Sequence, residues 1–190
     1  FMHCGVEAVI TNDPQKLSES EALVLPGVGA FSDGMSRLQS LGIDKILKDH
    51  ASKNKLILGI CLGMQLLLES SEEFGQHEGL GLIKGHVRYF HNMKEFKKDT
   101  KVPHIGWNEI EITRETPLFA NINHTDMYFA HSLCALTTNV EDTFAIVTYD
   151  NIKFAAIVGQ ESTFGCQFHP EKSSINGLRI IKNLLGDSKK

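Results

Sequence analysis

The sequence predicts one α/β domain built on a mixed β-sheet, and three observations support this fold class. Apolar runs of strand length alternate with helical patterns in the first half of the chain, whereas the second half is rich in short β-branched and aromatic runs. No internal repeat or low-complexity tract divides the 190 residues. A hydrophobic content of 42% with 22% charged residues is typical of a folded chain with one core.

The first half of the chain predicts strands separated by helices. The expected strands, each a short apolar run, are Val6–Thr11, Ala22–Leu25 and Leu56–Ile60. Between the last two, apolar residues recur at near-helical spacing over Gly34–Lys48, which indicates an amphipathic helix. Strong helix formers follow over Met64–Glu69, so we expect Cys61 where a buried strand passes directly into a helix.

The second half predicts further strands and a closing helix. Its β-branched and aromatic runs are His86–Phe90, Asn108–Ile112, Met127–Ala130, Phe144–Tyr149, Phe154–Val158 and Thr163–Phe168. Leucine and isoleucine then recur at helical spacing over Gly177–Leu185, which indicates a final amphipathic helix.

Charge, cysteine usage and the lack of known binding motifs exclude several classes of protein. With 19 Lys+Arg against 23 Asp+Glu the net charge is -4, which gives no electrostatic basis for binding nucleic acid or an anionic membrane surface. No apolar stretch approaches the roughly 20 residues that span a bilayer. The 4 cysteines are dispersed, a pattern that favours a reducing cytoplasm over a disulfide scaffold. Without an H-E-x-x-H, G-x-G-x-x-G or P-loop pattern, we expect no metal and no cofactor.

The segment Gly59-Ile60-Cys61-Leu62-Gly63 has the spacing of a nucleophile elbow. Glycines two residues before and two after Cys61 relieve crowding at a sharp strand-to-helix turn that exposes the sulfur. The N–H groups of the following helix favour a thiolate there, and Leu62 N–H is placed to donate to an oxyanion. Taken alone, the pattern leaves open that Cys61 is a small buried core residue.

A base and a carboxylate follow another expected strand, in Phe168-His169-Pro170-Glu171. Open α/β sheets place their sites at the C-terminal ends of strands, so we expect these residues at the same edge as Cys61. A cysteine nucleophile needs a base and a third group that holds the imidazole, roles that His169 and Glu171 can fill. Each of them also fits an ordinary surface position, and their joint occurrence favours a triad.

A glycine-rich turn follows the expected strand Ala22–Leu25. Its residues Gly27, Val28 and Gly29 leave backbone N–H groups free to approach a developing oxyanion, which makes them candidates for an oxyanion-binding loop. A simple tight turn is the alternative.

Five ordered motifs resemble those of the class I, or triad, glutamine amidotransferases. They are 26–31, 59–65, 103–108, 128–132 and 167–173. Within this family they are most similar to the glutaminase subunits of imidazole glycerol phosphate synthases. The resemblance covers nearly the whole chain and implies one amidotransferase domain over residues 1–190, with a flavodoxin-like fold whose mixed, mainly parallel central sheet is flanked by helices.

The resemblance implies roles for particular residues. Cys61 attacks the carboxamide of L-glutamine, His169 carries the proton to the leaving ammonia, and Glu171 orients His169. Hydrolysis of the resulting thioester gives glutamate. The implied substrate-binding positions are Gln65, Glu73 and the backbone of His131 and Ser132.

The resemblance also implies a partner. In the family, ammonia passes to a (β/α)8-barrel cyclase subunit of the heterodimer, which makes imidazole glycerol phosphate and AICAR in histidine biosynthesis. We expect a flexible Gly27-Val28 peptide that completes the oxyanion hole only in the activated complex. Relatives begin with a strand and a D-Y-G-x-G-N loop, whereas this sequence opens at Phe1, so the first strand and the start of the first helix are expected to be missing.

Other functions are compatible with these motifs. A paralogous amidotransferase that supplies ammonia to a sugar-modifying synthetase of surface-polysaccharide synthesis would carry the same triad. A non-catalytic binding or regulatory subunit would keep the fold, although the complete triad argues against it. A cysteine peptidase or redox protein would use the same nucleophile chemistry. Glutaminases of the pyridoxal phosphate pathway or the GMP type are disfavoured by Met64 before Gln65 and by the segment His104–Asn108.

Overall fold

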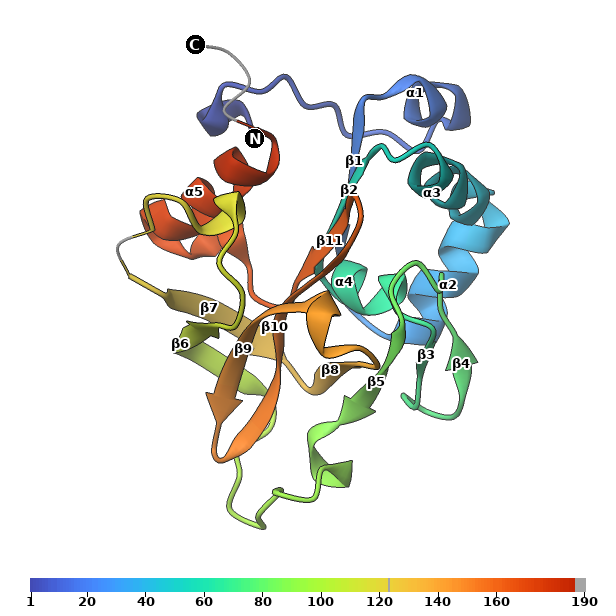
Figure 1. The fold of residues 1–190 in the computed structure, drawn as a ribbon. Helices are drawn as coiled ribbons and strands as arrows, with labels where there is room; N and C mark the ends of the chain where they lie inside the picture. Colours follow the sequence, from blue (N-terminus) through green and yellow to red (C-terminus); the bar gives the residue numbers. More distant parts are fainter. Residues whose placement is uncertain (123, 187–190) are drawn as a thin grey trace.

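A computed structural model describes residues 1–122 and 124–186, and the main feature of this part is a seven-stranded sheet with helices on both sides (Figure 1). The strand order is β1-β2-β11-β10-β9-β6-β7. These strands are β1 (Ala22–Gly27), β2 (Leu56–Cys61), β6 (His104–Ile112), β7 (Asp126–His131), β9 (Thr143–Tyr149), β10 (Ile152–Gln160) and β11 (Thr163–Cys166).

Parallel pairing in this sheet joins β1 to β2 and β2 to β11, whereas the other neighbouring strands pair antiparallel. The α/β class and the mixed sheet expected from the sequence are confirmed, but the expectation of a mainly parallel sheet is wrong. The antiparallel pairs β9–β10 and β10–β11 are each joined by two residues and have no crossover helix. Between β9 and β10, Asp150 and Asn151 have φ values of 45° and 69°, as a two-residue hairpin turn requires.

A smaller four-stranded sheet lies beside the large one among the described residues, at the lower right of Figure 1. Its strands, in the order β4-β3-β5-β8, are β3 (Ser70–Ser71), β4 (His77–Glu78), β5 (Gly85–Tyr89) and β8 (Leu133–Thr137). The sequence analysis did not anticipate β8, which pairs antiparallel with β5. Because β8 follows β7 after one residue, the chain passes from one sheet to the other at Ser132.

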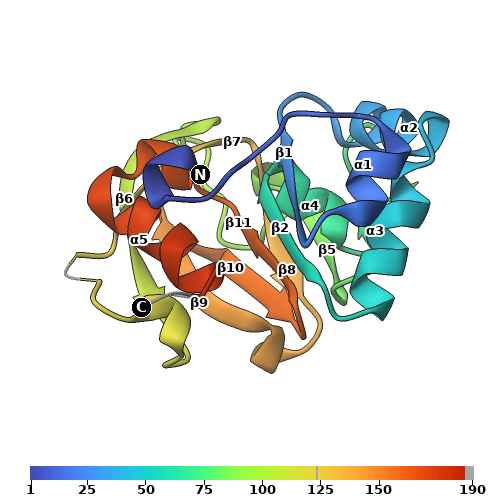
Figure 2. The same ribbon diagram turned by 90° about the horizontal axis from the view of Figure 1, so that it is seen from above.

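Helices cover both faces of the large sheet. They are α1 (Pro14–Glu19), α2 (Phe31–Ser40), α3 (Ile43–Ser52), α4 (Leu62–Leu67) and α5 (Ser174–Leu184), with short 3-10 turns at Met2–Cys4, Phe90–Asn92, Pro117–Phe119, Val140–Asp142 and Pro170–Lys172. Figures 1 and 2 show α1 to α4 on one side and α5 on the other. The single helix expected over Gly34–Lys48 is two helices, because Gly42 adopts the left-handed φ of 68° between them.

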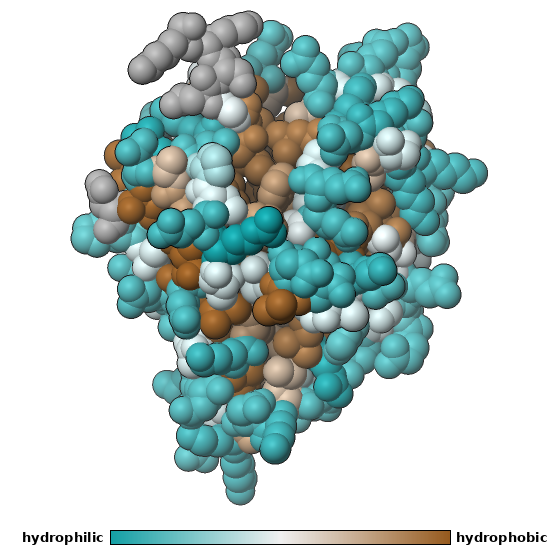
Figure 3. Space-filling view, in the orientation of Figure 1, coloured by the Kyte–Doolittle hydropathy of each residue, from teal (hydrophilic) through white to brown (hydrophobic). Residues whose placement is uncertain are grey.

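The strand expected over Val6–Thr11 does not form. A strand is stabilised by the backbone of a neighbour, and this segment pairs with no strand in the described part of the chain. Val9 and Ile10 are consequently 69% and 105% exposed. β1 is the outer strand on this side, and apolar residues are visible at the surface between α5 and α1 (Figure 3).

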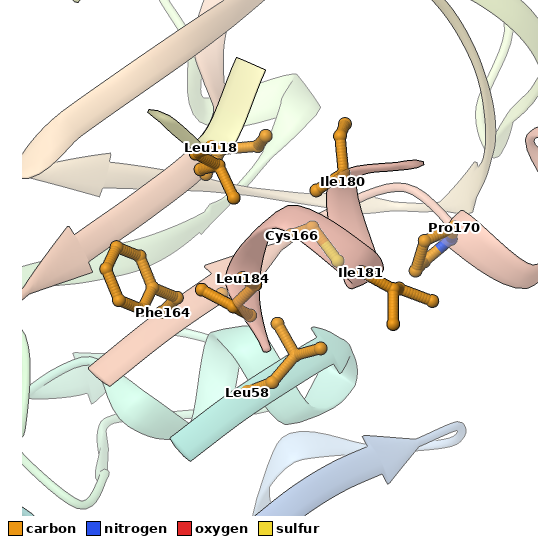
Figure 4. A pocket seen from close by; sticks show the side chains of 10 residues that line it. Leu58, Leu118, Phe164, Cys166, Pro170, Ile180, Ile181 and Leu184 are labelled. Atoms are coloured by element: carbon orange, nitrogen blue, oxygen red, sulfur yellow. The ribbon is translucent and has the colours of Figure 1, made fainter. Parts of the chain in front are cut away.

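The core has two apolar clusters. One contains Phe31 and Met64 with the helices α2 and α4, and the other contains Phe129 and Phe168 with α5. A cavity of about 10 Å³ lies between the sheet and α5, with Ile180 among its lining residues (Figure 4). Its lining side chains are apolar, so it offers a ligand neither room nor polar contacts.

Candidate active site

Cys61 occupies a strained turn between β2 and α4. Its φ of 55° and ψ of -111° are rare for a residue with a side chain. A Cβ on Gly59 would lie 2.6 Å from Gly63 O, and a Cβ on Gly63 would overlap Leu25 O. Both glycines are therefore required by close backbone contacts, and the sharp strand-to-helix turn predicted from their spacing is confirmed.

The surroundings of Cys61 favour the neutral thiol. The residue is 7% exposed, and this burial raises the pKa of the Cys61 thiol above its usual value. The backbone N–H of Leu62 opposes the rise in pKa, and the negative charge of Glu171 adds to it. A base must therefore remove the proton before the sulfur can act as a nucleophile near neutral pH.

His169 and Glu171 lie at the same end of the sheet as Cys61. β11 runs parallel to β2 with Cys166 opposite Ile60, so the residues that follow both strands emerge together. His169 Nδ1 lies 2.8 Å from Glu171 Oε1. The His169 side chain is 12% exposed and that of Glu171 is 51% exposed. The structure thus brings all three residues of the expected triad to one edge.

No hydrogen bond joins Cys61 to His169 within the described residues. The thiol instead lies 3.9 Å from Ala130 O, to which it donates, and Gln167 Nε2 donates to the sulfur at 3.8 Å. Contacts between catalytic groups are commonly long without substrate and tighten in the complex. Cys61 and His169 therefore lie at one edge of the sheet without a direct hydrogen bond between them in the described part of the chain.

The glycine-rich loop lies against the elbow. Gly27 pairs with Cys61 across β1 and β2, and a Cβ on Gly27 would be 3.0 Å from Leu62 Cβ. Val28 is 84% exposed, and Gly29 has a φ of 95°, which favours glycine. Of the candidate oxyanion residues, Gly27 and Leu62 therefore lie beside Cys61, and Val28 and Gly29 continue the loop from Gly27.

The expected substrate-binding residues are spread over three elements. Gln65, on α4, is 3% exposed. Glu73 follows β3, and its Oε2 accepts a hydrogen bond from Phe31 N at 2.6 Å, so this carboxylate stabilises the start of α2. His131 ends β7 with a buried side chain, and Ser132 connects β7 to β8.

Sequence reasoning missed Gln167 as part of this site. Its side chain is fully buried between Cys61 and Gln65. The observation that places Gln167 in the site is the parallel register of β2 and β11. Cys166 pairs with Ile60, so the next residue, Gln167, lies opposite Cys61. That register was not available before the pairing was known.

A pair of buried histidines was also missed. His131 Nδ1 lies 2.6 Å from Leu133 O and donates to it, and His131 Nε2 lies 3.1 Å from His104 Nδ1. His104 Nε2 lies 2.8 Å from Asn108 Oδ1. Burial and the nearby His104 lower the pKa of His131 to about 3, and burial also lowers the pKa of His104. The pair is therefore neutral and fixes the backbone at the start of β8.

Among residues 1–122 and 124–186, no three His, Cys, Asp or Glu side chains are grouped to hold a metal ion. No helix in this part of the chain is long and apolar enough to cross a membrane.

The fold and the elbow define a class I glutamine amidotransferase. The family described as Glutamine amidotransferase class-I matches residues 1–186, and the chain belongs to it. More particularly, the imidazole glycerol phosphate synthase subunit HisH of Sulfurimonas denitrificans is 48% identical over 96% of this chain and 87% of that protein. The subunit of the same name from Chlorobium chlorochromatii is 40% identical over 96% of this chain and 89% of that protein.

Solved structures agree on the fold. One described as a crystal structure of glutamine amidotransferase has a TM-score of 0.69 at 15% identity, and the match covers 97% of this chain and 87% of that chain. The resemblance drawn from the five sequence motifs is confirmed by these comparisons.

Proposed function

We propose that this chain is the glutaminase subunit of an imidazole glycerol phosphate synthase and hydrolyses L-glutamine to glutamate and ammonia. One observation carries the proposal: Cys61, on a strained elbow, shares a sheet edge with the His169–Glu171 pair. The names of relatives at 48% and 40% identity favour the histidine pathway over surface-polysaccharide synthesis.

In the proposed mechanism, His169 takes the proton of Cys61 as the sulfur attacks the carboxamide carbon of glutamine. The tetrahedral intermediate expels ammonia, which receives the proton from His169, and a glutamyl thioester is left on the sulfur. His169 then activates a water that hydrolyses the thioester to glutamate and restores the thiol. Glu171, 2.8 Å from His169 Nδ1, holds the imidazole and stabilises its protonated form.

The oxyanion is held by backbone N–H groups in this mechanism. Leu62 N–H is next to the sulfur, and the Gly27-Val28 peptide lies alongside it. The exposure of Val28 and the left-handed φ of Gly29 support a peptide that reorients to complete the oxyanion hole when the partner is activated.

Glutamine is recognised by Gln65, Glu73 and the backbone of His131 and Ser132. Both N–H groups of the Gln65 amide are engaged, by Gln167 Oε1 and Leu133 O. Its Oε1 is therefore the atom that can accept a hydrogen bond from the ammonium group of the substrate.

We further propose that ammonia passes to a (β/α)8-barrel cyclase subunit in a heterodimer, where it enters the formation of imidazole glycerol phosphate and AICAR. The names of the relatives support this partner. Residues 1–190 act as one amidotransferase domain, which the family match over residues 1–186 supports. The four cysteines, all free, support a reducing cytoplasm as its location.

The test is release of glutamate and ammonia from glutamine by this chain, alone and mixed with a barrel cyclase subunit and its ribonucleotide ligand. We expect strong activity in the mixture and none with Cys61→Ala. Full activity of the chain alone would contradict gating by the partner. No activity in the mixture, with Cys61 still labelled by a glutamine-like electrophile, would contradict the histidine-pathway assignment.

A further inference from the structure

A row of buried polar groups leads from β8 to the nucleophile. Gln65 Nε2 donates to Leu133 O at 3.4 Å and to Gln167 Oε1 at 2.9 Å, and Gln167 Nε2 donates to Cys61 Sγ at 3.8 Å. Gln65 is 3% exposed and Gln167 is fully buried. The row is therefore shielded from water, and its members must satisfy one another.

One backbone carbonyl decides how both amides are oriented. An amide side chain can be turned over without changing its shape, so its direction must follow from its partners. Leu133 O can only accept, and it already accepts from His131 Nδ1 at 2.6 Å. Gln65 must therefore present its nitrogen to Leu133, and the second N–H of that nitrogen requires the oxygen of Gln167.

The orientation of Gln167 follows from that of Gln65. With its oxygen committed to Gln65, Gln167 has its nitrogen on the side of Cys61. The amide of Gln167 thus presents a hydrogen-bond donor to the sulfur at 3.8 Å, whereas Ala130 O is the acceptor for the thiol proton at 3.9 Å. A donor favours a thiolate over a thiol, because the anion accepts the hydrogen bond more strongly.

We infer that Gln167 donates an N–H to the sulfur of Cys61 and stabilises its thiolate during the reaction. This inference deepens the proposed function and rests on it for the role of the thiolate. Burial and the charge of Glu171 both oppose the anion, and Leu62 N–H favours it from the helix side. Gln167 supplies a second donor from the β11 side, held in place by Gln65 and Leu133.

The test is the rate at which iodoacetamide alkylates Cys61 between about pH 6 and pH 11, with the product located by mass spectrometry of its peptide. Gln167→Met keeps the length of the side chain and removes the donor. In Gln167→Met we expect the midpoint of the curve of alkylation rate against pH to rise by about one pH unit. The alkylation rate at neutral pH should fall about tenfold. Gln65→Met removes the anchor of the amide, so a smaller rise of the same sign is expected.

Gln160→Met is the matched control, because Gln160 ends β10 opposite Thr163, at the other end of the sheet from Cys61. Its midpoint should equal that of the native chain. The buried Cys134 and Cys166 in the same sample report unfolding, because they become reactive only when the core opens. A native midpoint in folded Gln167→Met would overturn the inference.

If the variants do not fold, a measurement on the native chain tests whether Gln167 donates to the sulfur of Cys61. The side-chain N–H signals of Gln167 in a nitrogen-15 spectrum should titrate with the midpoint of Cys61 alkylation. Signals that do not move through that midpoint would overturn the inference.

In the complete complex, Gln167→Met should lower kcat about tenfold with KM unchanged. Alkylation and titration do not require turnover, so a native chain that fails to hydrolyse glutamine would contradict the proposed function and leave this test intact.

Discussion

Cys61, the proposed nucleophile, and the proposed acid–base pair His169–Glu171 are held in different ways. Cys61 is 7% exposed and is followed by α4, whose six residues are all buried. Glu171 is 51% exposed and lies on a 3-10 turn at Pro170–Lys172. The turn that carries Cys61 is therefore fixed by close backbone contacts at Gly59 and Gly63, whereas the carboxylate beside the 12% exposed His169 side chain is half exposed.

This difference separates two requirements of the proposed reaction. A strained nucleophile is kept in place by a packed core that cannot adapt, since close backbone contacts leave no room. A base that must transfer a proton four times, from the thiol, to ammonia, from water and back to the sulfur, needs access to substrate, leaving group and water. Changes at the cysteine side should therefore affect folding and chemistry together, and changes at the base side should affect chemistry alone.

The largest effect is expected from Cys61→Ala. Without the sulfur no thioester forms, so glutamine hydrolysis in the complex should fall by at least about a thousandfold. Release of glutamate is the measurement, and Cys134→Ala, which removes another buried sulfur, should retain activity. Comparable activity in the two variants would break the assignment of the nucleophile.

The next effect is on stability, in Gly63→Ala. The added methyl overlaps Leu25 O, so we expect a loss of at least about 3 kcal/mol in urea unfolding, or no folding. Gly29→Ala is the matched control: its Cβ meets nothing within 4 Å, and only its φ of 95° resists, for about 1 kcal/mol. Equal losses of unfolding free energy in Gly63→Ala and Gly29→Ala would show that the turn at Cys61 is not more rigid than the glycine-rich loop.

Glu171→Gln should change chemistry with little effect on stability. The half-exposed carboxylate contributes little to folding, so the free energy of unfolding should change by less than about 0.5 kcal/mol. Glutamine turnover should fall about 10- to 100-fold, because the partner of His169 loses the negative charge that stabilises the protonated imidazole. The pKa of Cys61 should fall at the same time, since the charge that raises it is gone. A rise in the pH midpoint of Cys61 alkylation in Glu171→Gln would contradict the effect of the Glu171 charge on the Cys61 thiol.

The smallest effect is an acid dependence of stability that comes from the buried side. The pKa of His131 is lowered from 6.5 to about 3, so the folded chain holds it neutral while the unfolded chain takes up a proton. Stability from this group is complete above pH 6.5 and is lost as the pH falls toward 3, by at most about 1.4 kcal/mol per pH unit. Urea unfolding at a series of pH values measures the slope, and His131→Asn should flatten it. An unchanged slope would contradict the buried neutral pair.

The sequence predicted the part of the site that depends on local geometry. Glycines at 59 and 63 around a cysteine determine the elbow, because the clash that they avoid lies within a few residues and one neighbouring strand. The edge shared by Cys61 and His169 followed from the general placement of sites in α/β sheets.

The features that were missed depend on partners far along the chain. β8 forms because β5 supplies a pairing edge, and Val6–Thr11 has strand composition but no neighbour in the described chain. The orientation of Gln167 depends on a carbonyl at Leu133, which only the folded arrangement places beside Gln65. Propensity and spacing carry no information on such contacts.

The contact between Glu73 and Phe31 limits how far the glycine-rich loop can travel. Gly27 is anchored by its pairing with Cys61, and Phe31 is anchored by the carboxylate of Glu73. Only three residues, 28–30, span the distance between these two anchors. A segment this short cannot move as a lid, but one of its peptide planes can rotate. The change that we propose for the oxyanion hole is therefore a rotation of one peptide between two orientations. Such a rotation orders few residues, so it costs little conformational entropy.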